Sequence, residues 1–327
     1  MKALVYTGPK SLDYRETADP VPGDEALVRI AHVGICGSDM HAWAGHDERR
    51  PAPLILGHEA AGTVIEGHGT GSRVTINPLI TCGVCRACRE GRENLCRRRQ
   101  IASMPPREGA FAEMIAMPAA NLVTLPDDVP TEKAALAEPI ACGWHAVRLA
   151  RAALHRPLED ARCLVLGGGA IGMGAALVLA AHGAGKIHVA EMHPGRRATV
   201  QEAGDFNAFD PTEREQRDVD LVIDAVGIDA TRAAASAAVR PGGVIAHIGL
   251  GAGTGGLDIR RFTLQEITFF GTYTYTKADF RATAEAIFAG RLGTLDWPDI
   301  RPLSDGARAF DDIAAGQVAA PKIILTP

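Results

Sequence analysis

The chain has 327 residues, more than one hydrophobic core of ordinary size holds, and this length suits two domains. Apolar residues make up 46% and charged residues 22% of the chain, which is an ordinary globular composition. The formal net charge of −5 gives no cationic footprint for nucleic acid or for an anionic membrane surface, and no apolar run is long enough to cross a bilayer. We therefore expect no nucleic-acid partner and no membrane partner.

Cysteine usage indicates metal binding. The seven cysteines are an odd number, and four of them lie in one short stretch. This pattern favours metal binding in a reducing compartment over a disulfide framework. The N-terminal residues 1–6 lack the long apolar core of a signal peptide and are typical of a first strand. We expect a cytoplasmic protein.

Short β-strands are predicted throughout the first segment, up to about residue 140. Strand-like runs separated by glycine and proline occupy residues 3–6, 26–33, 62–66, 73–76 and 111–117. Turn-forming residues between these runs support an all-β, barrel-like or sandwich-like domain.

Within this segment Cys36, His58 and Glu59 offer a sulfur, a nitrogen and an oxygen donor. Such a mixed set suits a zinc ion that keeps one position open for chemistry. Taken singly, Cys36 is equally typical of a buried free cysteine, and His58 of a buried histidine beside an exposed glutamate.

Four further cysteines have metal-ligand spacing. Two CxxC steps share a cysteine and a fourth cysteine follows after seven residues, and the set is Cys82, Cys85, Cys88 and Cys96. Four thiolates close a tetrahedral shell, which predicts a structural zinc. An iron–sulfur site also uses four cysteines, and a nucleic-acid zinc knuckle could use the arginines at 97–99. Since no aromatic platform adjoins those arginines, a solvated surface is the better interpretation of them.

The middle segment alternates between strands and helices. A buried strand at 162–166 precedes a glycine-rich turn at 167–172, an alanine-rich helix at 173–182 and a second strand at 186–190. This context is the one that a GxGxxG dinucleotide-binding motif requires. Gly167 would form the tight turn, Gly169 would let the backbone approach the pyrophosphate, and Gly172 would allow close helix packing. Later strands at 220–227 and 243–250 also contain glycine at the carboxyl edge, where ligands bind in open sheets.

Glu191 ends the second strand and favours NAD, because its carboxylate can accept hydrogen bonds from the adenosine ribose and would repel a 2′-phosphate. Arg196 and Arg197 keep NADP open as the alternative. In the last segment, an amphipathic helix at 279–290 and a strand at 322–325 are expected to pack back on the first domain.

Together these motifs resemble the zinc-containing medium-chain dehydrogenase/reductase family, most of all its polyol (sorbitol-type) and threonine dehydrogenase branch. The blocks that carry the resemblance are Cys36 to His41, Gly57 to Glu59, the cysteine lobe and the glycine-rich turn. The resemblance implies a GroES-like, β-rich catalytic domain formed by residues 1–141 and 272–327. It also implies a Rossmann-type, doubly wound parallel-sheet domain at residues 142–271, and a homodimer or homotetramer.

The resemblance further implies the roles of individual residues. Cys36 and His58 would hold a catalytic zinc, with Glu59 and Glu138 bound to it directly or through water. Ser38 would take the substrate proton, His41 would relay it to solvent, and Asp39 would orient His58. Cofactor contacts are implied at Gly167, Gly169, Ile171, Gly172, Glu191, Arg196, Val226, Gly227, Ile248, Gly249, Leu250, Thr272 and Tyr273. A packed position in a sheet explains Tyr273 equally well.

The sequence thus predicts an oxidoreductase with two zinc ions per chain, one catalytic and one structural. It would transfer a hydride between NAD and an alcohol, namely a polyol, diol, secondary alcohol or hydroxy-amino acid. One alternative is an NADP-linked alcohol or aldehyde reductase. A second, from a different class, is a zinc-lobed binding protein without turnover. A zinc-free quinone reductase of the same fold would lack both ligand clusters.

Overall fold

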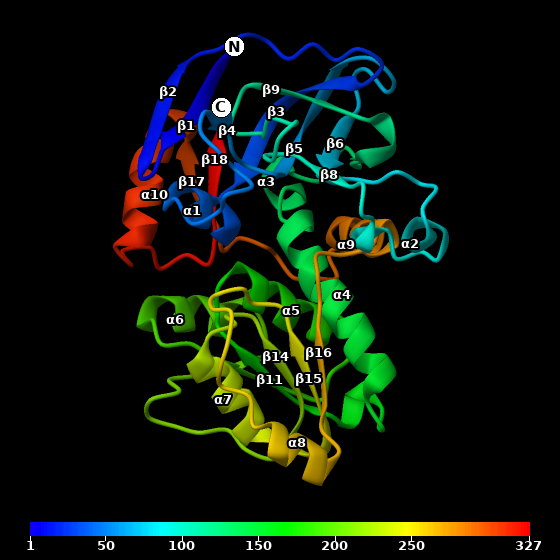
Figure 1. Cartoon of the computed structure of the whole chain (residues 1–327), viewed down its shortest axis with the longest axis vertical. Coiled ribbons are helices and arrows are strands. Elements are labelled where there is room, and N and C mark those ends of the chain that lie inside the picture. Colours follow the sequence, from blue (N-terminus) through cyan, green and yellow to red (C-terminus); the bar gives the residue numbers. More distant parts are fainter.

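Two stacked halves make up the molecule, and the computed structural model describes all residues from 1 to 327. Figure 1 shows the β-rich half above, with both chain ends in it, and the half built on a parallel sheet below. Helix α4 (Ala137–Ala153) runs from one half to the other, and the segment after β16 (Thr268–Gly271) returns beside it. No helix is both long enough and apolar enough to span a membrane.

The upper half contains a mixed sheet in the order β10-β6-β5-β3-β18-β17, with β9 also paired to β3, and a smaller sheet in the order β2-β1-β4. β7 and β8 form a separate pair. The strands are β1 (Lys2–Gly8), β2 (Ser11–Glu16), β3 (Ala26–Gly34), β4 (Leu54–Ile55), β5 (Glu59–Glu66), β6 (Arg73–Ile76), β7 (Leu79–Ile80), β8 (Gln100–Ile101), β9 (Met114–Met117), β10 (Leu122–Thr124), β17 (Asp299–Pro302) and β18 (Ile323–Thr326). The helices are α1 (Gly37–Trp43), α2 (Arg86–Arg89), α3 (Thr131–Ala134) and α10 (Gly306–Ala314).

The predicted β-rich first segment is therefore confirmed, with differences at its edges. The strand expected at 111–117 begins only at Met114, because the backbone of Phe111 bonds to Leu4 and Leu56 in a crossing between the two sheets. The strand β2 escaped prediction. Its residues alternate between half-buried and exposed, so they carry little apolar signal.

The lower half is a six-stranded sheet in the order β13-β12-β11-β14-β15-β16, with all neighbouring strands parallel. This is the order of a doubly wound dinucleotide-binding fold, as expected. The strands are β11 (Arg162–Leu166), β12 (Lys186–Ala190), β13 (Asn207–Phe209), β14 (Val219–Asp224), β15 (Val239–His247) and β16. The helices are α5 (Ala170–Ala181), α6 (Pro194–Ala203), α7 (Asp229–Ala238) and α8 (Ile259–Gln265). The segment after the sheet leads up to α9 (Lys277–Phe288), which packs against α4 where the two halves meet.

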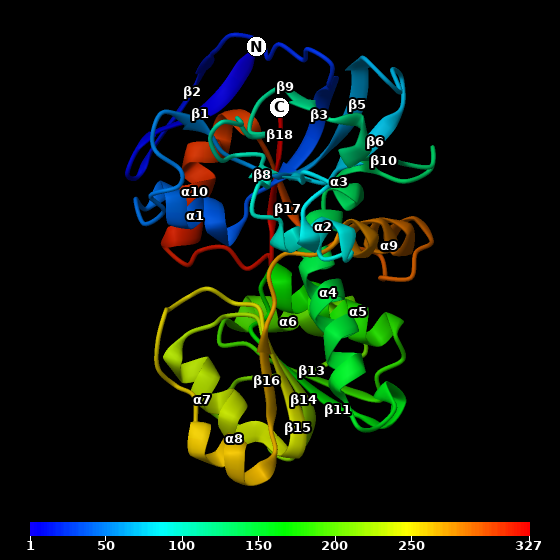
Figure 2. The same cartoon turned by 45° about the vertical axis from the view of Figure 1, so that its right-hand side comes forward.

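Side-chain alternation along the parallel strands gives the sheet two buried faces. On β11, Cys163 and Val165 point into the cluster that contains α4, α5 and α9. Leu164 and Leu166 point to the other face, which α7 and α8 cover. The first cluster also includes Ile324 of β18, so one apolar core extends from the parallel sheet into the upper half. Figure 2 shows the helices on both sides of this sheet.

Candidate metal and cofactor site

Three strand ends meet at one edge of the upper sheet and bring distant residues together. β3 and β5 are antiparallel, with Gly34 opposite Glu59, so the chain just after β3 lies beside the chain just before β5. β18 also pairs with β3, which places its preceding residue, Lys322, at the same edge. Cys36 and Glu59 are 23 positions apart in the sequence, yet strand pairing brings Cys36, His58 and Glu59 together.

One donor atom from each of Cys36, His58 and Glu59 lies within 4.8 Å of the other two. His58 and Glu59 are buried, and Cys36 is half-buried at the start of α1. Glu59 Oε2 is buried and accepts no hydrogen bond of good geometry. A sulfur, an imidazole nitrogen and an oxygen at this spacing fit a zinc ion with an open position.

Asp39 ties the two ligand segments together. Its carboxylate accepts hydrogen bonds from the backbone N–H of Cys36 at 3.0 Å and of Gly57 at 3.3 Å. Its Oδ1 lies 3.4 Å from His58 Nδ1. Burial opposes ionisation of Asp39, but the His58 ring, the nearby Arg50 and the Cys36 N–H outweigh it and lower its pKa to about 2. Because Nδ1 faces Asp39, the other ring nitrogen of His58 is free for a metal.

A buried lysine, which the sequence did not predict, neutralises Glu59. Lys322 Nζ lies 2.7 Å from Oε1 and 2.6 Å from Oε2 of that carboxylate, and it donates to the Ile35 carbonyl at 2.8 Å. Burial lowers the pKa of Lys322, but Glu59 and Cys36 outweigh it, so the net shift is upward and the side chain stays charged. A Cβ on Gly34 would collide with Glu59 Oε2, which makes that glycine necessary for this arrangement.

Glu138 lies in the first turn of α4 and is buried. The hydroxyl of Tyr275 donates to its Oε1 at 2.6 Å. Burial and repulsion by Glu59 raise the pKa of Glu138, although His58, Tyr275 and Lys322 oppose the shift. Glu138 is thus a second carboxylate beside the cluster, held by a tyrosine from the segment that returns from the lower half.

The proposed proton path starts beside the cluster. Ser38 is half-buried and His41 is exposed, one turn apart on α1. This placement is compatible with a path from the metal cluster to solvent. The proton-transfer roles themselves stay predictions.

The four-cysteine lobe is compact. The Sγ atoms of Cys82, Cys85, Cys88 and Cys96 lie near one another. Sγ–Sγ distances are 3.8 Å for Cys82–Cys88, 3.5 Å for Cys85–Cys88 and 3.5 Å for Cys82–Cys96. Tetrahedral zinc with Zn–S bonds of about 2.3 Å requires S···S separations of about 3.8 Å. Hydrogen bonds from the Val84 and Cys85 N–H groups lower the pKa of Cys82 to about 5, and Arg98 adds to this effect. The lobe therefore fits a closed structural zinc.

A cavity of about 370 Å³ connects the glycine-rich turn to the metal cluster. Gly167 has φ +95°, and a Cβ on Gly172 would collide with the Gly167 carbonyl, so both positions need glycine. The predicted cofactor residues that line the cavity are Gly167, Gly169, Ile171, Gly172, Glu191, Arg196 and Val226. From the upper half the lining includes Cys36, Met40, Glu59 and Lys322. A ligand bound to the glycine-rich turn would thus extend towards the metal ligands.

Glu191 has the geometry expected of a ribose ligand. Its carboxylate accepts hydrogen bonds from the N–H of Gly168 and of His193, both at 2.8 Å. Arg196 lies 3.5 Å from the same carboxylate, and Arg197 is engaged by Asp210 and by backbone carbonyls. Arg197 is therefore committed to partners inside the protein, whereas Arg196 lines the cavity.

The remaining predicted cofactor residues lie outside that cavity. They are Gly227, Ile248, Gly249, Leu250, Thr272 and Tyr273. Leu250 is 78% exposed. The Tyr273 ring lies 4.8 Å from the Arg99 guanidinium, on the cysteine lobe. Of the two tyrosines in this run, Tyr275 therefore lies at the carboxylates and Tyr273 lies at the lobe.

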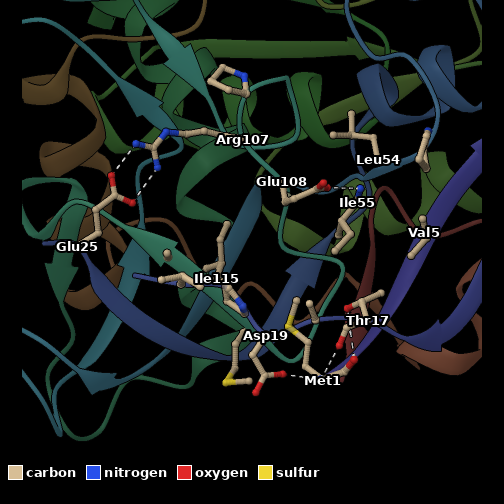
Figure 3. A pocket seen from close by; sticks show the side chains of 18 of the residues that line it. Met1, Val5, Thr17, Asp19, Glu25, Leu54, Ile55, Arg107, Glu108 and Ile115 are labelled. Atoms are coloured by element: carbon tan, nitrogen blue, oxygen red, sulfur yellow. Dashed lines mark hydrogen bonds and ion pairs between the residues drawn. The ribbon is translucent and has the colours of Figure 1, made fainter. Parts of the chain in front are cut away.

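A larger cavity, of about 740 Å³, lies elsewhere in the upper half (Figure 3). Its charged groups have partners: Arg107 pairs with Glu25, the N-terminal amine of Met1 pairs with Asp19, and Glu108 accepts from the N–H of Ile55. None of the metal ligands lines it. The candidate metal ligands therefore share a cavity with the glycine-rich turn and not with this larger one.

Four site residues were missed by the sequence reasoning: Arg50, Ser103, Tyr275 and Lys322. Lys322 is a lone charge before an apolar strand, which is a weak signal. Tyr275 was obscured because Thr274 has φ +45°, which breaks the alternation expected of a strand. Ser103 lies in a loop and carries no motif.

Comparisons with known proteins identify both parts of the chain. Residues 22–127 match the alcohol dehydrogenase GroES-like domain, and residues 170–289 match the zinc-binding dehydrogenase family. The chain is 34% identical to L-galactonate-5-dehydrogenase of Escherichia coli (strain K12), over 89% of this chain and 88% of that protein. It is 33% identical to sorbitol dehydrogenase of Bacillus subtilis (strain 168), over 84% and 82%. The solved structure of L-idonate 5-dehydrogenase from Escherichia coli has a TM-score of 0.89 at 25% identity and covers 100% of this chain and 98% of its own.

Proposed function

Because the chain belongs to the zinc-dependent medium-chain dehydrogenase/reductase family, we propose that it interconverts a secondary hydroxyl of a polyol or sugar acid and the corresponding ketone, with NAD as the hydride carrier. The observation that carries this proposal is the cavity shared by the glycine-rich turn and the Cys36–Glu59 cluster. The names of the relatives, a sorbitol dehydrogenase and two sugar-acid dehydrogenases, support this substrate class. Hydroxy-amino acids are the second candidate, supported by a relative named L-threonine 3-dehydrogenase.

Cys36, His58 and one or both of Glu59 and Glu138 would hold the catalytic zinc, which when bound polarises the alcohol oxygen as a Lewis acid. Ser38 would accept the hydroxyl proton, and His41 would pass it to solvent. Asp39 would keep His58 oriented through its Nδ1. The four-cysteine lobe would hold the second, structural zinc.

The position of Lys322 supports different roles for the carboxylates of Glu59 and Glu138. Since it already neutralises Glu59, we propose that Glu59 stays bound to Lys322 while substrate occupies the site. Glu138, whose Oε1 accepts from Tyr275, would then be the carboxylate nearer to the substrate hydroxyl. Glu59→Gln should alter both the zinc content and kcat, and unchanged values of both would contradict a role for Glu59.

NAD rather than NADP is supported by Glu191, which two backbone N–H groups hold at the cavity wall. A 2′-phosphate there would meet a fixed negative charge. We expect kcat/KM to favour NAD by more than about tenfold, and Glu191→Ala to narrow that ratio. Equal values for the two cofactors in the wild-type enzyme would contradict the assignment.

The test of the proposed function is an NAD-reduction screen on zinc-loaded protein, over hexitols, pentitols, aldonates, simple secondary alcohols and L-threonine. Polyols or aldonates should give the highest kcat/KM. A preference for L-threonine would transfer the proposal to the second candidate, and absence of turnover on all classes would contradict it.

Three further assignments belong to the same proposal. The first two are a homodimer or homotetramer, which the family resemblance supports, and a cytoplasmic location, which the cysteine usage supports. The division into residues 1–141 with 272–327 and residues 142–271 is supported by the pairing of β18 with β3. Helix α4 runs through the proposed boundary at residue 142.

A further inference from the structure

A buried arginine links helix α1 to the loop that contains Ser103, and both segments flank His58. Arg50 is 3% exposed, although arginine is among the residues least often buried. Its Nη1 donates to the Ser38 carbonyl at 2.7 Å, and its Nε donates to the Ser103 carbonyl at 2.9 Å. Its remaining ion-pair contact, with Asp47, is long at 3.5 Å. The guanidinium therefore bonds mainly to two backbone carbonyls, one in the first turn of α1 and one in the loop that contains Ser103.

Both segments contact His58. Ser103 is fully buried, and its Oγ lies 3.3 Å from His58 Nδ1, on the same ring nitrogen that Asp39 approaches. Ser103 also has φ +69°, a left-handed conformation that is costly for a residue with a Cβ and persists only where its surroundings enforce it. The bond from Arg50 to the Ser103 carbonyl is such a constraint.

On the other side, Ser38 precedes Asp39 on α1, and Asp39 contacts His58 and the Cys36 N–H. A shift of the Ser38 carbonyl would therefore move the proposed proton acceptor and the carboxylate that orients the imidazole together. The planar guanidinium fork fixes α1 and the Ser103 loop at once, which a single ammonium group cannot do in the same geometry.

We propose that Arg50 is a positioning residue that sets the places of Ser38 and Ser103 around His58, so that the histidine is held for metal binding and the serine for proton transfer. This proposal rests on the proposed function for its kinetic consequences only, because the hold on His58 has a readout that needs no substrate. Arg50 touches neither substrate nor metal and acts through the two serines.

The neighbouring arginine provides a matched control. Arg49 bonds to Asp47 alone, at 2.8 and 3.0 Å, and its side chain is 63% exposed. Arg49→Met removes the same charge one residue away without touching either serine. Arg50→Lys keeps the charge and removes the fork.

The experiment compares Arg50→Met, Arg50→Lys, Arg49→Met and Ser103→Ala in the zinc-loaded enzyme. The first readout is the rate at which a chromogenic chelator removes zinc. Since residues that orient a metal-binding histidine typically change affinity about 10- to 100-fold, one of the two zinc ions should leave Arg50→Met at least about fivefold faster. Arg49→Met should stay within about twofold of the wild type, because it leaves the serines in place.

The second readout separates kcat from KM. Arg50→Met should lower kcat about 10- to 100-fold while KM for NAD stays within about twofold, because a small misplacement costs rate without touching the cofactor. If Arg50 acts partly through Ser103, the loss of kcat in the double variant Arg50→Met/Ser103→Ala, expressed as a free energy, should be smaller than the sum of the two single losses. Additive effects would contradict that path.

Wild-type values of zinc release and kcat in a folded Arg50→Met would overturn the proposal, as would equal losses in Arg49→Met. Should Arg50→Met fail to fold, Arg50→Lys takes its place in the comparison. A lower kcat and faster zinc release in Arg50→Lys would support positioning by the guanidinium, and wild-type values of both would overturn the proposal. If the wild-type enzyme turns over no alcohol, the proposed function fails while the zinc-release comparison still tests Arg50.

Discussion

The two metal-ligand clusters are built in opposite ways. The cysteine lobe takes all four ligands from one stretch, residues 82–96, and all four are thiols. The proposed catalytic cluster would take one ligand after β3 and two at the start of β5. It adds Lys322, just before the C-terminal strand, and Tyr275 from the returning segment. A local cluster of one donor type favours stability. A cluster of mixed donors, assembled by the fold and lined with opposing charges, favours chemistry at an open metal position.

The two clusters are also in indirect contact. In the lobe, Asn94 donates to the Tyr273 carbonyl at 2.8 Å, and Glu93 accepts from the Lys277 N–H at 2.5 Å. Tyr275, between those two positions, bonds to Glu138. The lobe therefore supports the segment that carries a residue of the catalytic cluster.

Removing a catalytic ligand should have the largest effect. Cys36→Ser should lower kcat/KM about a thousandfold or more, because the loss of Lewis-acid polarisation removes several kcal/mol of transition-state stabilisation. The unfolding midpoint should change little, since Cys36 is half-buried at a helix start. Steady-state kinetics and thermal melts measure the two effects. A kcat/KM within tenfold of the wild type would contradict a catalytic role for the cluster that contains Cys36.

Removing a lobe ligand should affect stability strongly and catalysis weakly. Cys85→Ser should lower the free energy of unfolding by about 3 kcal/mol or more, because binding of a structural zinc contributes directly to folding. In the protein that remains folded, kcat should fall only a few-fold, through the contact of the lobe with residues 273–277. Urea denaturation and active-site-normalised kinetics test this. A fully stable Cys85→Ser protein would show that the lobe does not carry structural zinc.

A third substitution tests a buried ion pair that belongs to neither cluster. Asp279 accepts hydrogen bonds from Arg148 and Thr276 and lies 2.7 Å from His145, so it joins α9 to α4. Burial opposes its ionisation, but these partners lower its pKa well below 3.8. Asp279→Asn should cost about 2 to 4 kcal/mol of stability at neutral pH without changing the zinc content.

The pH dependence of this change has a defined sign. A carboxylate with a depressed folded-state pKa stabilises the protein above its unfolded value, and the contribution disappears as the pH falls through the folded value. The difference in unfolding free energy between the wild type and Asp279→Asn should therefore shrink as the pH falls below 3.8. A difference that grows below pH 3.8 would contradict the ion-pair account.

The smallest expected effect is at the contact between the two clusters. Tyr275→Phe removes the hydrogen bond to Glu138 and leaves the ring in place, so kcat should fall about five- to tenfold, which corresponds to about 1 kcal/mol. Tyr273→Phe is the matched control, because that ring lies on Arg99 of the lobe. Equal losses in the two variants would show that the returning segment matters only as packing.

The sequence predicted what depends on local spacing. The four cysteines, the glycine-rich turn with Glu191, and the strands at 162–166 and 186–190 all occur as expected, because each is encoded within one short stretch. The family resemblance and the two-part architecture also hold. Lys322, Tyr275 and Arg50 could not be predicted, since each reaches the site through strand pairing, a left-handed residue or a loop contact. These are consequences of tertiary structure.

The central claim is that one cluster holds a catalytic zinc and the other a structural zinc. The most direct test is the zinc content per folded chain, measured side by side with alcohol-dependent NADH formation, in the wild type, Cys36→Ser and Cys85→Ser. The account predicts two zinc ions in the wild type and one in each variant, with turnover abolished only in Cys36→Ser. A Cys36→Ser protein that keeps both zinc ions, or keeps turnover with one, would contradict it.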